Sequence, residues 1–383
     1  MKIIPYGRQQ ITDEDILAVN NVLRSDLLTQ GPAIQAFENA FASYCGSNYA
    51  IALSNGTTAL HLAALALGVN GSSNVITSPI TFVASANCVR YCGGTVWFAD
   101  IDPVTYTMDI GKVRQLIASK PKGFFQGIIP VDFAGFAVNL EELRALADEH
   151  GLWIIEDACH SPGGYFTDKS GKKQVCGNGK FAEISVFSFH PVKHIACGEG
   201  GMITTDNKEL YEKIMLLRTH GITKDPQLLE DHHGGWYYEM QQLGYNYRLT
   251  DFQSALGLSQ LGRAENGMER RKAIARKYNE TFTNMPGIVS HSGLVTGHAY
   301  HLYIIEVNDR KALYDFLKEK NIYTQVHYIP VHTMPYYKQF GWKQGDFPSA
   351  EQYYNRCLSL PMYPALSDEE QDYVITSIKT FFA

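Results

Sequence analysis

The segment SFHPVKHIACGEGG, residues 188–201, contains the residue with the clearest chemical potential, Lys193. Lys193 follows a short apolar run and precedes a turn that contains Gly198, Gly200 and Gly201. Burial among apolar neighbours lowers the pKa of a lysine, because the charged form loses its hydration. A neutral amine is the form that condenses with an aldehyde. Most lysines are solvated surface charges, so the interpretation depends on whether other residues offer matching chemistry.

Two further motifs offer such chemistry. SNGTT, residues 54–58, separates a predicted strand from a predicted helix, and the free backbone N–H groups of a helix N-terminus attract phosphate. An ordinary helix cap after an Asn55-Gly56 turn explains the same residues. EDACHS, residues 156–161, ends another predicted strand, where Asp157 could pair with a protonated ring nitrogen. A loop-capping aspartate and a buried, hydrogen-bonded His160 are the plainer alternatives.

Together the three motifs indicate one ligand with a phosphate, a ring nitrogen and an aldehyde, which is pyridoxal 5′-phosphate (PLP). Gly177, Gly179 and Ala182 match the dinucleotide pattern GxGxxA, but no strand precedes them and no helix follows, so we predict a loop. The pair His232–His233 lacks a third ligand at helical spacing. We therefore expect no metal.

The elements that position these motifs form an alternating pattern. Val- and Ile-rich runs between helices are typical of a mostly parallel sheet that is covered on both faces. The predicted strands are 49–54, 74–79, 95–101, 127–133, 152–158, 185–190 and 201–205, with helices at 56–68 and 139–151. Beyond them we predict a helical stretch over 249–284, strands over 301–307 and 324–331, and helices over 312–322, 350–359 and 367–382. This pattern predicts a large α/β domain over 1–255, including an N-terminal segment 1–25, and a smaller α+β domain over 256–383.

Composition excludes several classes of protein. The 383 residues are 45% hydrophobic and 19% charged, which is ordinary for a globular enzyme and too apolar for a disordered chain. The net charge of −6 argues against nucleic acid as a partner, because phosphate backbones require basic surface. No apolar run reaches about 18 residues and the N-terminus lacks a signal-peptide pattern, so we expect neither a membrane span nor secretion. Seven cysteines without CxxC spacing favour reduced thiols and a cytoplasmic location.

The chain resembles the DegT/DnrJ-type sugar-nucleotide aminotransferases, which have the PLP-dependent transferase fold type I of the aspartate aminotransferase class. The resemblance covers nearly the whole chain. It is carried by LTQGPAIQAFE (28–38), SNGTTALHLA (54–63), SPITFVASAN (78–87), EDACHS, SFHPVKHIACGEGG, WYYEMQQLGYNYRLTDFQSALGLSQL (236–261) and QVHYIPVH (325–332). SFHPVK and QVHYIPVH are most similar to aminotransferases of pseudaminic acid biosynthesis.

The resemblance implies roles for residues that match the family's motifs. Lys193 would hold PLP covalently and then shuttle protons, and Asp157 would pair with the pyridine nitrogen. Phe82 would stack on the ring, and His160 stands near the phenolic oxygen, where many relatives carry Gln. The remaining implied contacts are Gly56, Thr57 and Ser188 to the phosphate, Asn246 to the cofactor of the neighbouring subunit, and Tyr6, Arg8, His327, Tyr328 and His332 to substrate.

The same resemblance implies a homodimer with shared active sites and a transaminase reaction. L-Glutamate would donate the amino group, and C4 of a UDP-linked 4-keto-6-deoxy-N-acetyl-hexosamine would accept it. The product would be a UDP-4-amino-4,6-dideoxy sugar for surface polysaccharides or flagellin glycosylation. Three alternatives stay open: a dTDP- or GDP-linked 4-keto sugar as acceptor, a sugar dehydratase of the same fold, and a non-catalytic protein that retains the PLP fold. Those dehydratases carry His at the position of Lys193, which disfavours the second.

Overall fold

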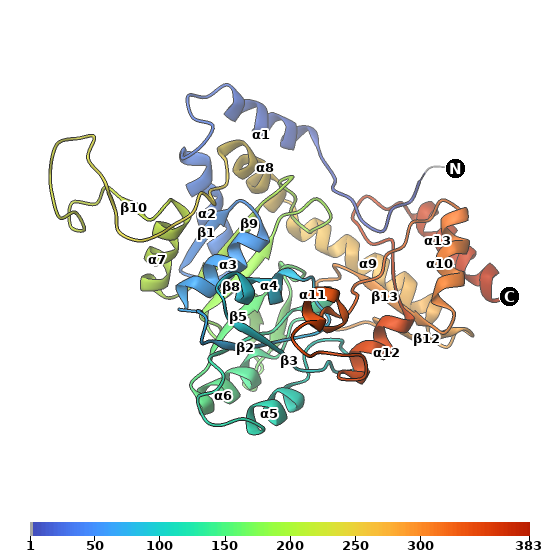
Figure 1. Ribbon diagram of the computed structural model, residues 1–383. Coiled ribbons are helices and arrows are strands. Elements are labelled where there is room, and N and C mark those ends of the chain that lie inside the picture. Colours follow the sequence, from blue (N-terminus) through green and yellow to red (C-terminus); the bar gives the residue numbers. More distant parts are fainter. Residues whose placement is uncertain (1–2) are drawn as a thin grey trace.

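The computed structural model of the protein describes residues 3–383, and a seven-stranded sheet forms its larger half (Figure 1). The strand order is β1-β9-β8-β5-β4-β2-β3, and β9 runs antiparallel to both of its neighbours while the other strands are parallel to one another. The strands are β1 (Tyr49–Leu53), β2 (Asn74–Thr77), β3 (Thr95–Phe98), β4 (Gly127–Ile129), β5 (Trp153–Asp157), β8 (Ile184–Ser188) and β9 (Gly201–Thr205). The predicted mixed, mostly parallel sheet is confirmed.

Helices bury both faces of this sheet. Neighbouring residues of one strand enter different cores: Ile155 of β5 packs with the helices α3 and α4, and Ile154 packs with α5 and α6. Side chains of adjacent strand residues point to opposite faces, so a strand covered on both sides is apolar throughout. The helices of this half are α2 (Pro32–Cys45), α3 (Gly56–Ala66), α4 (Ala84–Tyr91), α5 (Ile110–Ala118), α6 (Leu140–His150) and α7 (Lys208–Arg218).

A three-stranded antiparallel sheet forms the smaller half, which is orange to red in Figure 1. Its strands are β12 (Ile288–His291), β13 (Tyr303–Val307) and β14 (Cys357–Leu360). Its helices are α9 (Ala264–Phe282), α10 (Arg310–Glu319), α12 (Pro348–Arg356) and α13 (Asp368–Phe382). The proposed domain boundary at residue 256 lies within α8 (Asp251–Leu261).

Three predicted elements differ from the structure. The helical stretch over 249–284 is two helices, α8 and α9, separated at Gly262 and Arg263. The predicted strand over 324–331 is wrong, because only Gln325 pairs with a strand residue and the Val331 N–H donates to the Pro79 carbonyl instead. The predicted helix over 350–359 ends at Arg356, since the following residues are buried against β13 as β14.

The remaining elements are short or peripheral. They are α1 (Asp13–Leu23), α11 (Pro335–Lys338), the 3₁₀ turns η1 (Phe133–Gly135) and η2 (Val331–Thr333), and the strand pairs β6 (Tyr165–Thr167) with β7 (Lys173–Val175) and β10 (Ile222–Thr223) with β11 (Glu239–Met240). The loop between β10 and β11 projects from the body of the protein (Figure 1). Gly177 and Gly179 lie in a loop between β7 and β8, so the predicted loop is confirmed. The expectation that no strand precedes them is wrong, because Lys173–Val175 pair with β6 as β7. Within residues 3–383 no helix combines the length and apolar character that a membrane crossing needs.

Candidate active site

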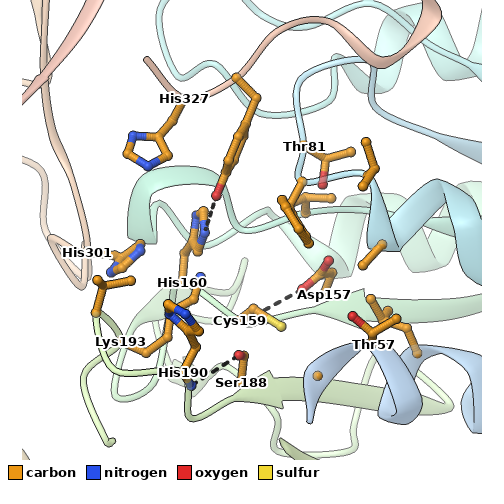
Figure 2. A pocket seen from close by; sticks show the side chains of 18 of the residues that line it. Thr57, Thr81, Asp157, Cys159, His160, Ser188, His190, Lys193, His301 and His327 are labelled. Atoms are coloured by element: carbon orange, nitrogen blue, oxygen red, sulfur yellow. Dashed lines mark hydrogen bonds between the residues drawn. The ribbon is translucent and has the colours of Figure 1, made fainter. Parts of the chain in front are cut away.

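A cavity of about 870 Å³ lies at the carboxyl ends of the parallel strands. β5 ends at Asp157 and β8 ends at Ser188, while β1 leads through a tight turn into α3. In open α/β sheets, ligands bind beyond these strand ends. Figure 2 shows side chains from these separate strands around one space. The predicted residues that line it are Tyr6, Gly56, Thr57, Phe82, Asp157, His160, Ser188, Lys193, His327 and Tyr328.

Lys193 lies in the loop between β8 and β9, where its backbone N–H donates to the His190 carbonyl at 2.8 Å. Burial lowers the pKa of Lys193 from 10.5 to about 8, and the nearby Cys159 and Asp157 oppose this shift only in part. An ammonium group loses hydration in the cavity, so the neutral amine becomes accessible near neutral pH. Lys193 therefore has the protonation behaviour of a nucleophilic lysine.

Asp157 is the last residue of β5 and is 5% exposed. Ser85 donates its hydroxyl to Asp157 Oδ2 at 2.5 Å, and the backbone N–H of Cys159 donates to Oδ1 at 3.2 Å. Two donors hold the carboxylate in one orientation toward the cavity. A carboxylate fixed in this way can pair with a protonated ring nitrogen and keep it cationic.

The turn before α3 is shaped for a phosphate. The Asn55 side chain caps the helix by accepting the Thr58 N–H at 2.9 Å. Within residues 3–383, the backbone N–H groups of Gly56 and Thr57 have no hydrogen-bond partner, and they begin the helix at the edge of the cavity. A side chain at Gly56 would place its Cβ 3.0 Å from Ser188 Cβ, so the glycine keeps this cradle open. Free N–H groups at a helix N-terminus form an anion site.

His160 is 4% exposed and lies between the two halves of the protein. Its Nδ1 accepts the Ala134 N–H at 3.2 Å, and its Nε2 lies 3.2 Å from the Tyr328 hydroxyl (Figure 2). Burial, followed by the charge of Lys193, lowers the pKa of His160 well below its ordinary value. The imidazole is therefore neutral at physiological pH.

The smaller half and the N-terminal segment provide the opposite wall. The Tyr6 ring lies 5.1 Å from the His327 ring, and His327 Nδ1 lies 2.9 Å from Ser359 Oγ. Phe82 is 57% exposed and its ring lies 6.1 Å from that of Tyr328, so a large apolar face borders the open space. This wall offers aromatic faces and neutral polar atoms rather than charge.

The structure places three predicted site residues outside this cavity. Arg8 lines a second cavity of about 290 Å³, which borders the segment around Lys193. His332 is fully buried, with Nε2 3.0 Å from Glu351 Oε1 and its ring against Phe347, so its position favours packing over substrate contact. Asn246 is exposed and lies outside the lining of the cavity.

Three residues of the site were missed in the sequence analysis. Ser85 lies within the matched segment SPITFVASAN (78–87), but nothing in its spacing indicates a bond to Asp157, which is 72 residues away. Cys159 lies within EDACHS and its Sγ would be 3.5 Å from a Cβ at Gly56. His301 contacts His160 with ring centroids 4.4 Å apart, and it comes from the start of a strand region in the smaller half. A search for polar residues at the strand ends could have found Cys159, whereas Ser85 and His301 required the fold.

The side chains of the cavity fit PLP. A lysine of lowered pKa, a hydrogen-bonded carboxylate and a helix N-terminus with free N–H groups border one space. The aldehyde, the ring nitrogen and the phosphate of the cofactor need these three groups. The cradle kept open by Gly56 supplies the room that the phosphate requires.

Comparisons with known proteins give the same assignment. Residues 9–379 match the DegT/DnrJ/EryC1/StrS aminotransferase family. The chain is 40% identical to the spore coat polysaccharide biosynthesis protein SpsC of Bacillus subtilis, over 98% of this chain and 96% of SpsC. Its structure is similar to Helicobacter pylori PseC, an aminotransferase involved in the biosynthesis of pseudoaminic acid, with a TM-score of 0.89, 32% identity and coverage of 100% and 99% of the two chains. It also matches the PMP form of Spr1654 of Streptococcus pneumoniae, with a TM-score of 0.89, 28% identity and 98% coverage of each chain.

Proposed function

The chain belongs to the DegT/DnrJ/EryC1/StrS aminotransferase family, and we propose that it transfers an amino group from L-glutamate to C4 of a UDP-linked 4-keto-6-deoxy-N-acetyl-hexosamine. The product is a UDP-4-amino-4,6-dideoxy sugar of a polysaccharide or flagellin glycosylation pathway. One observation carries the proposal: Lys193, Asp157 and the N-terminus of α3 line the same cavity. The similarity to PseC, an aminotransferase involved in the biosynthesis of pseudoaminic acid, supports the pathway. The choice of a UDP sugar follows from the resemblance carried by SFHPVK and QVHYIPVH.

PLP, when bound, supplies an aldehyde that takes up an amino group and a cationic ring that withdraws electrons. Lys193 would hold the aldehyde, and its neutral amine would move the proton at the reacting carbon of the substrate. Proton transfer by a positioned base contributes typically about 10²–10⁴ in rate. Asp157 keeps the ring nitrogen protonated, because Ser85 and the Cys159 N–H hold its carboxylate in place. Gly56, Thr57 and Ser188 would bind the phosphate, and Phe82 would pack against the ring.

The acceptor sugar binds against the aromatic wall formed by Tyr6, His327 and Tyr328. These rings offer apolar faces and neutral hydrogen-bonding atoms, which suit a sugar better than a charged group. A panel of UDP-, dTDP- and GDP-linked 4-keto sugars, analysed by mass spectrometry with glutamate as donor, tests the nucleotide. Amination of the UDP sugar is expected, and preference for a dTDP or GDP sugar would replace this part of the proposal.

We propose a homodimer in which Asn246 reaches the cofactor of the neighbouring subunit. The exposure of Asn246 outside the cavity of its own chain supports this arrangement. The proposed compartment is the cytoplasm, which is supported by seven free cysteines, several of them in the core.

Borohydride reduction of PLP-loaded protein, followed by digestion and mass spectrometry, tests the covalent link. A pyridoxyl adduct is expected on Lys193, and the Lys193→Ala variant should lack the adduct and the amino-group exchange while remaining folded by circular dichroism. The Lys112→Ala variant is the matched control, because Lys112 is exposed on α5. Absence of an adduct at Lys193 in loaded wild-type protein would contradict the proposal. An adduct without amino exchange from glutamate would favour a non-catalytic PLP-fold protein.

A further inference from the structure

A chain of hydrogen bonds enters the cavity from the backbone of η1. The Ala134 N–H donates to His160 Nδ1 at 3.2 Å, so this nitrogen presents its lone pair and carries no proton. The ring is neutral, which leaves the proton on Nε2. Nε2–H therefore donates to the Tyr328 hydroxyl oxygen, 3.2 Å away and 168 residues distant in sequence. The bonds of this chain all run in one direction, from the backbone amide toward the cavity.

The turn η1, whose Ala134 N–H donates the first of these hydrogen bonds, is fixed by contacts with several other segments. Ala134 has a φ of 59°, a left-handed conformation that an alanine keeps only when its surroundings enforce it. Asp132 accepts the Val138 N–H at 2.9 Å and the Ser161 hydroxyl at 2.6 Å, which closes the turn on itself. The Ala134 carbonyl accepts the Leu302 N–H at 3.1 Å. The turn that carries the Ala134 N–H is thus bonded to both halves of the protein, and this N–H selects the tautomer of His160.

The last group in this series of hydrogen bonds is the Tyr328 hydroxyl, and Tyr328 borders the cavity together with Lys193. Its oxygen already accepts a hydrogen bond from His160, so its own hydrogen is available for donation. Among residues 3–383, no other group bonds to this hydroxyl. Burial raises the pKa of Tyr328, so the phenol keeps its proton at physiological pH. The cavity therefore meets a hydrogen-bond donor of fixed direction at this point.

We propose that Tyr328 is a catalytic residue that protonates the carbonyl oxygen of the keto substrate, and that His160 and Ala134 are its positioning residues. The inference rests on the proposed transaminase function. A ketone oxygen has lone pairs and no hydrogen, so it matches a site that can only donate. The Nε2–H of His160 then stabilises the phenolate oxygen that forms when Tyr328 gives up its proton.

The step balances in atoms and charge. An amino group adds to the carbonyl carbon while the C=O π bond breaks, and the oxygen takes the phenol proton of Tyr328. One hydrogen of the amino group restores the phenol. The second hydrogen joins the same oxygen, and the C–O bond breaks to release water as the C=N bond forms. In the opposite direction, Tyr328 assists the addition of water that releases the keto acid derived from glutamate.

The Tyr328→Phe variant tests this role with glutamate in D₂O. Exchange of the glutamate α-hydrogen occurs before any carbonyl group is formed and needs only Lys193. The exchange rate should therefore stay within about threefold of the wild-type rate. Formation of 2-oxoglutarate requires the water step and should fall by about 10²–10⁴. Tyr337→Phe is the matched control, because the buried Tyr337 hydroxyl donates to Asn87 Oδ1 at 2.7 Å and lies outside the cavity lining. An equal loss of both rates in Tyr328→Phe, or no loss of either, would overturn the proposal.

Two measurements independent of turnover complete the test. PLP affinity and the pH titration of its visible absorption should be the same in Tyr328→Phe and wild type, whereas a change in either would place the hydroxyl on the cofactor instead of the ketone. In cofactor-free protein with ¹⁵N-labelled histidine, the signals that vanish in His160→Gln should show the Nε2–H tautomer, and the Nδ1–H tautomer would refute the direction of the chain. These outcomes differ from a failure of the proposed function, in which Lys193 would carry no pyridoxyl adduct.

Discussion

Replacing Lys193 with methionine should stabilise the apoenzyme, although it abolishes the chemistry. Lys193 has a pKa of about 8 in the folded protein against an ordinary value of 10.5. The folded state therefore binds the lysine proton less tightly than the unfolded state does, and this difference opposes folding wherever the unfolded lysine is charged. Methionine has a similar length and no charge, so it removes the penalty without opening a large cavity.

The two pKa values set the size and the pH window of the effect. A difference of about 2.5 pH units corresponds to about 3 kcal/mol at pH 7, at 1.36 kcal/mol per unit. The penalty is fully present below pH 8 and is lost as the pH rises from 8 to 10.5. The advantage of Lys193→Met should thus fall from about 3 kcal/mol at pH 7 to about 2 at pH 9 and below about 0.5 at pH 10.5. For 383 residues the unfolding entropy is about 0.8 kcal/mol per kelvin, so the advantage at pH 7 raises Tm by about 4 °C.

Equilibrium urea unfolding of both apoproteins between pH 6 and pH 11 measures this difference. The Lys112→Met variant is the control, because it removes an exposed ammonium from α5 and leaves the cavity unchanged. A stability difference for Lys193→Met that is absent, or that is independent of pH, would refute the reasoning that burial perturbs this lysine.

Three further predictions concern the frame of the site and its neighbours. Glu38→Gln should destabilise the protein by about 3 kcal/mol in urea unfolding, because Glu38 Oε1 accepts a 2.6 Å bond from the buried Arg218; a loss below about 1 kcal/mol would contradict the assignment of a buried ion pair. Gly56→Ala should weaken PLP binding at least about tenfold, since the added Cβ meets Ser188 Cβ at 3.0 Å; fluorescence titration of the apoprotein measures it, and unchanged affinity would show that the cradle has spare room. Asn246→Ala should weaken PLP retention during dialysis without changing the circular dichroism spectrum, and a fully active monomer in sedimentation would rule out a role across the interface.

Much of the fold could be predicted because the periodic signals are strong and local. Continuous apolar runs between amphipathic helices predict a sheet buried on both faces, and the structure confirms it. The prediction of a strand over 324–331 was wrong for a physical reason. Pro330 lacks an N–H group, and the N–H of the neighbouring Val331 donates to a loop carbonyl instead of a strand. The predicted helix over 350–359 was too long, because burial of Leu358 and Leu360 against β13 overrides the local helix propensity.

The motifs of the chain were sufficient to predict which strand ends border the cavity. Asp157, Lys193 and the turn at Gly56 follow buried strands, and parallel strands bring such ends to one edge of a sheet. The other side chains that contact these residues could be identified only from the packing of the two halves. The tertiary structure joined His160 to Tyr328 across 168 residues and buried His332 in the core, because such contacts depend on how the smaller half packs against the sheet and leave no local pattern in the chain.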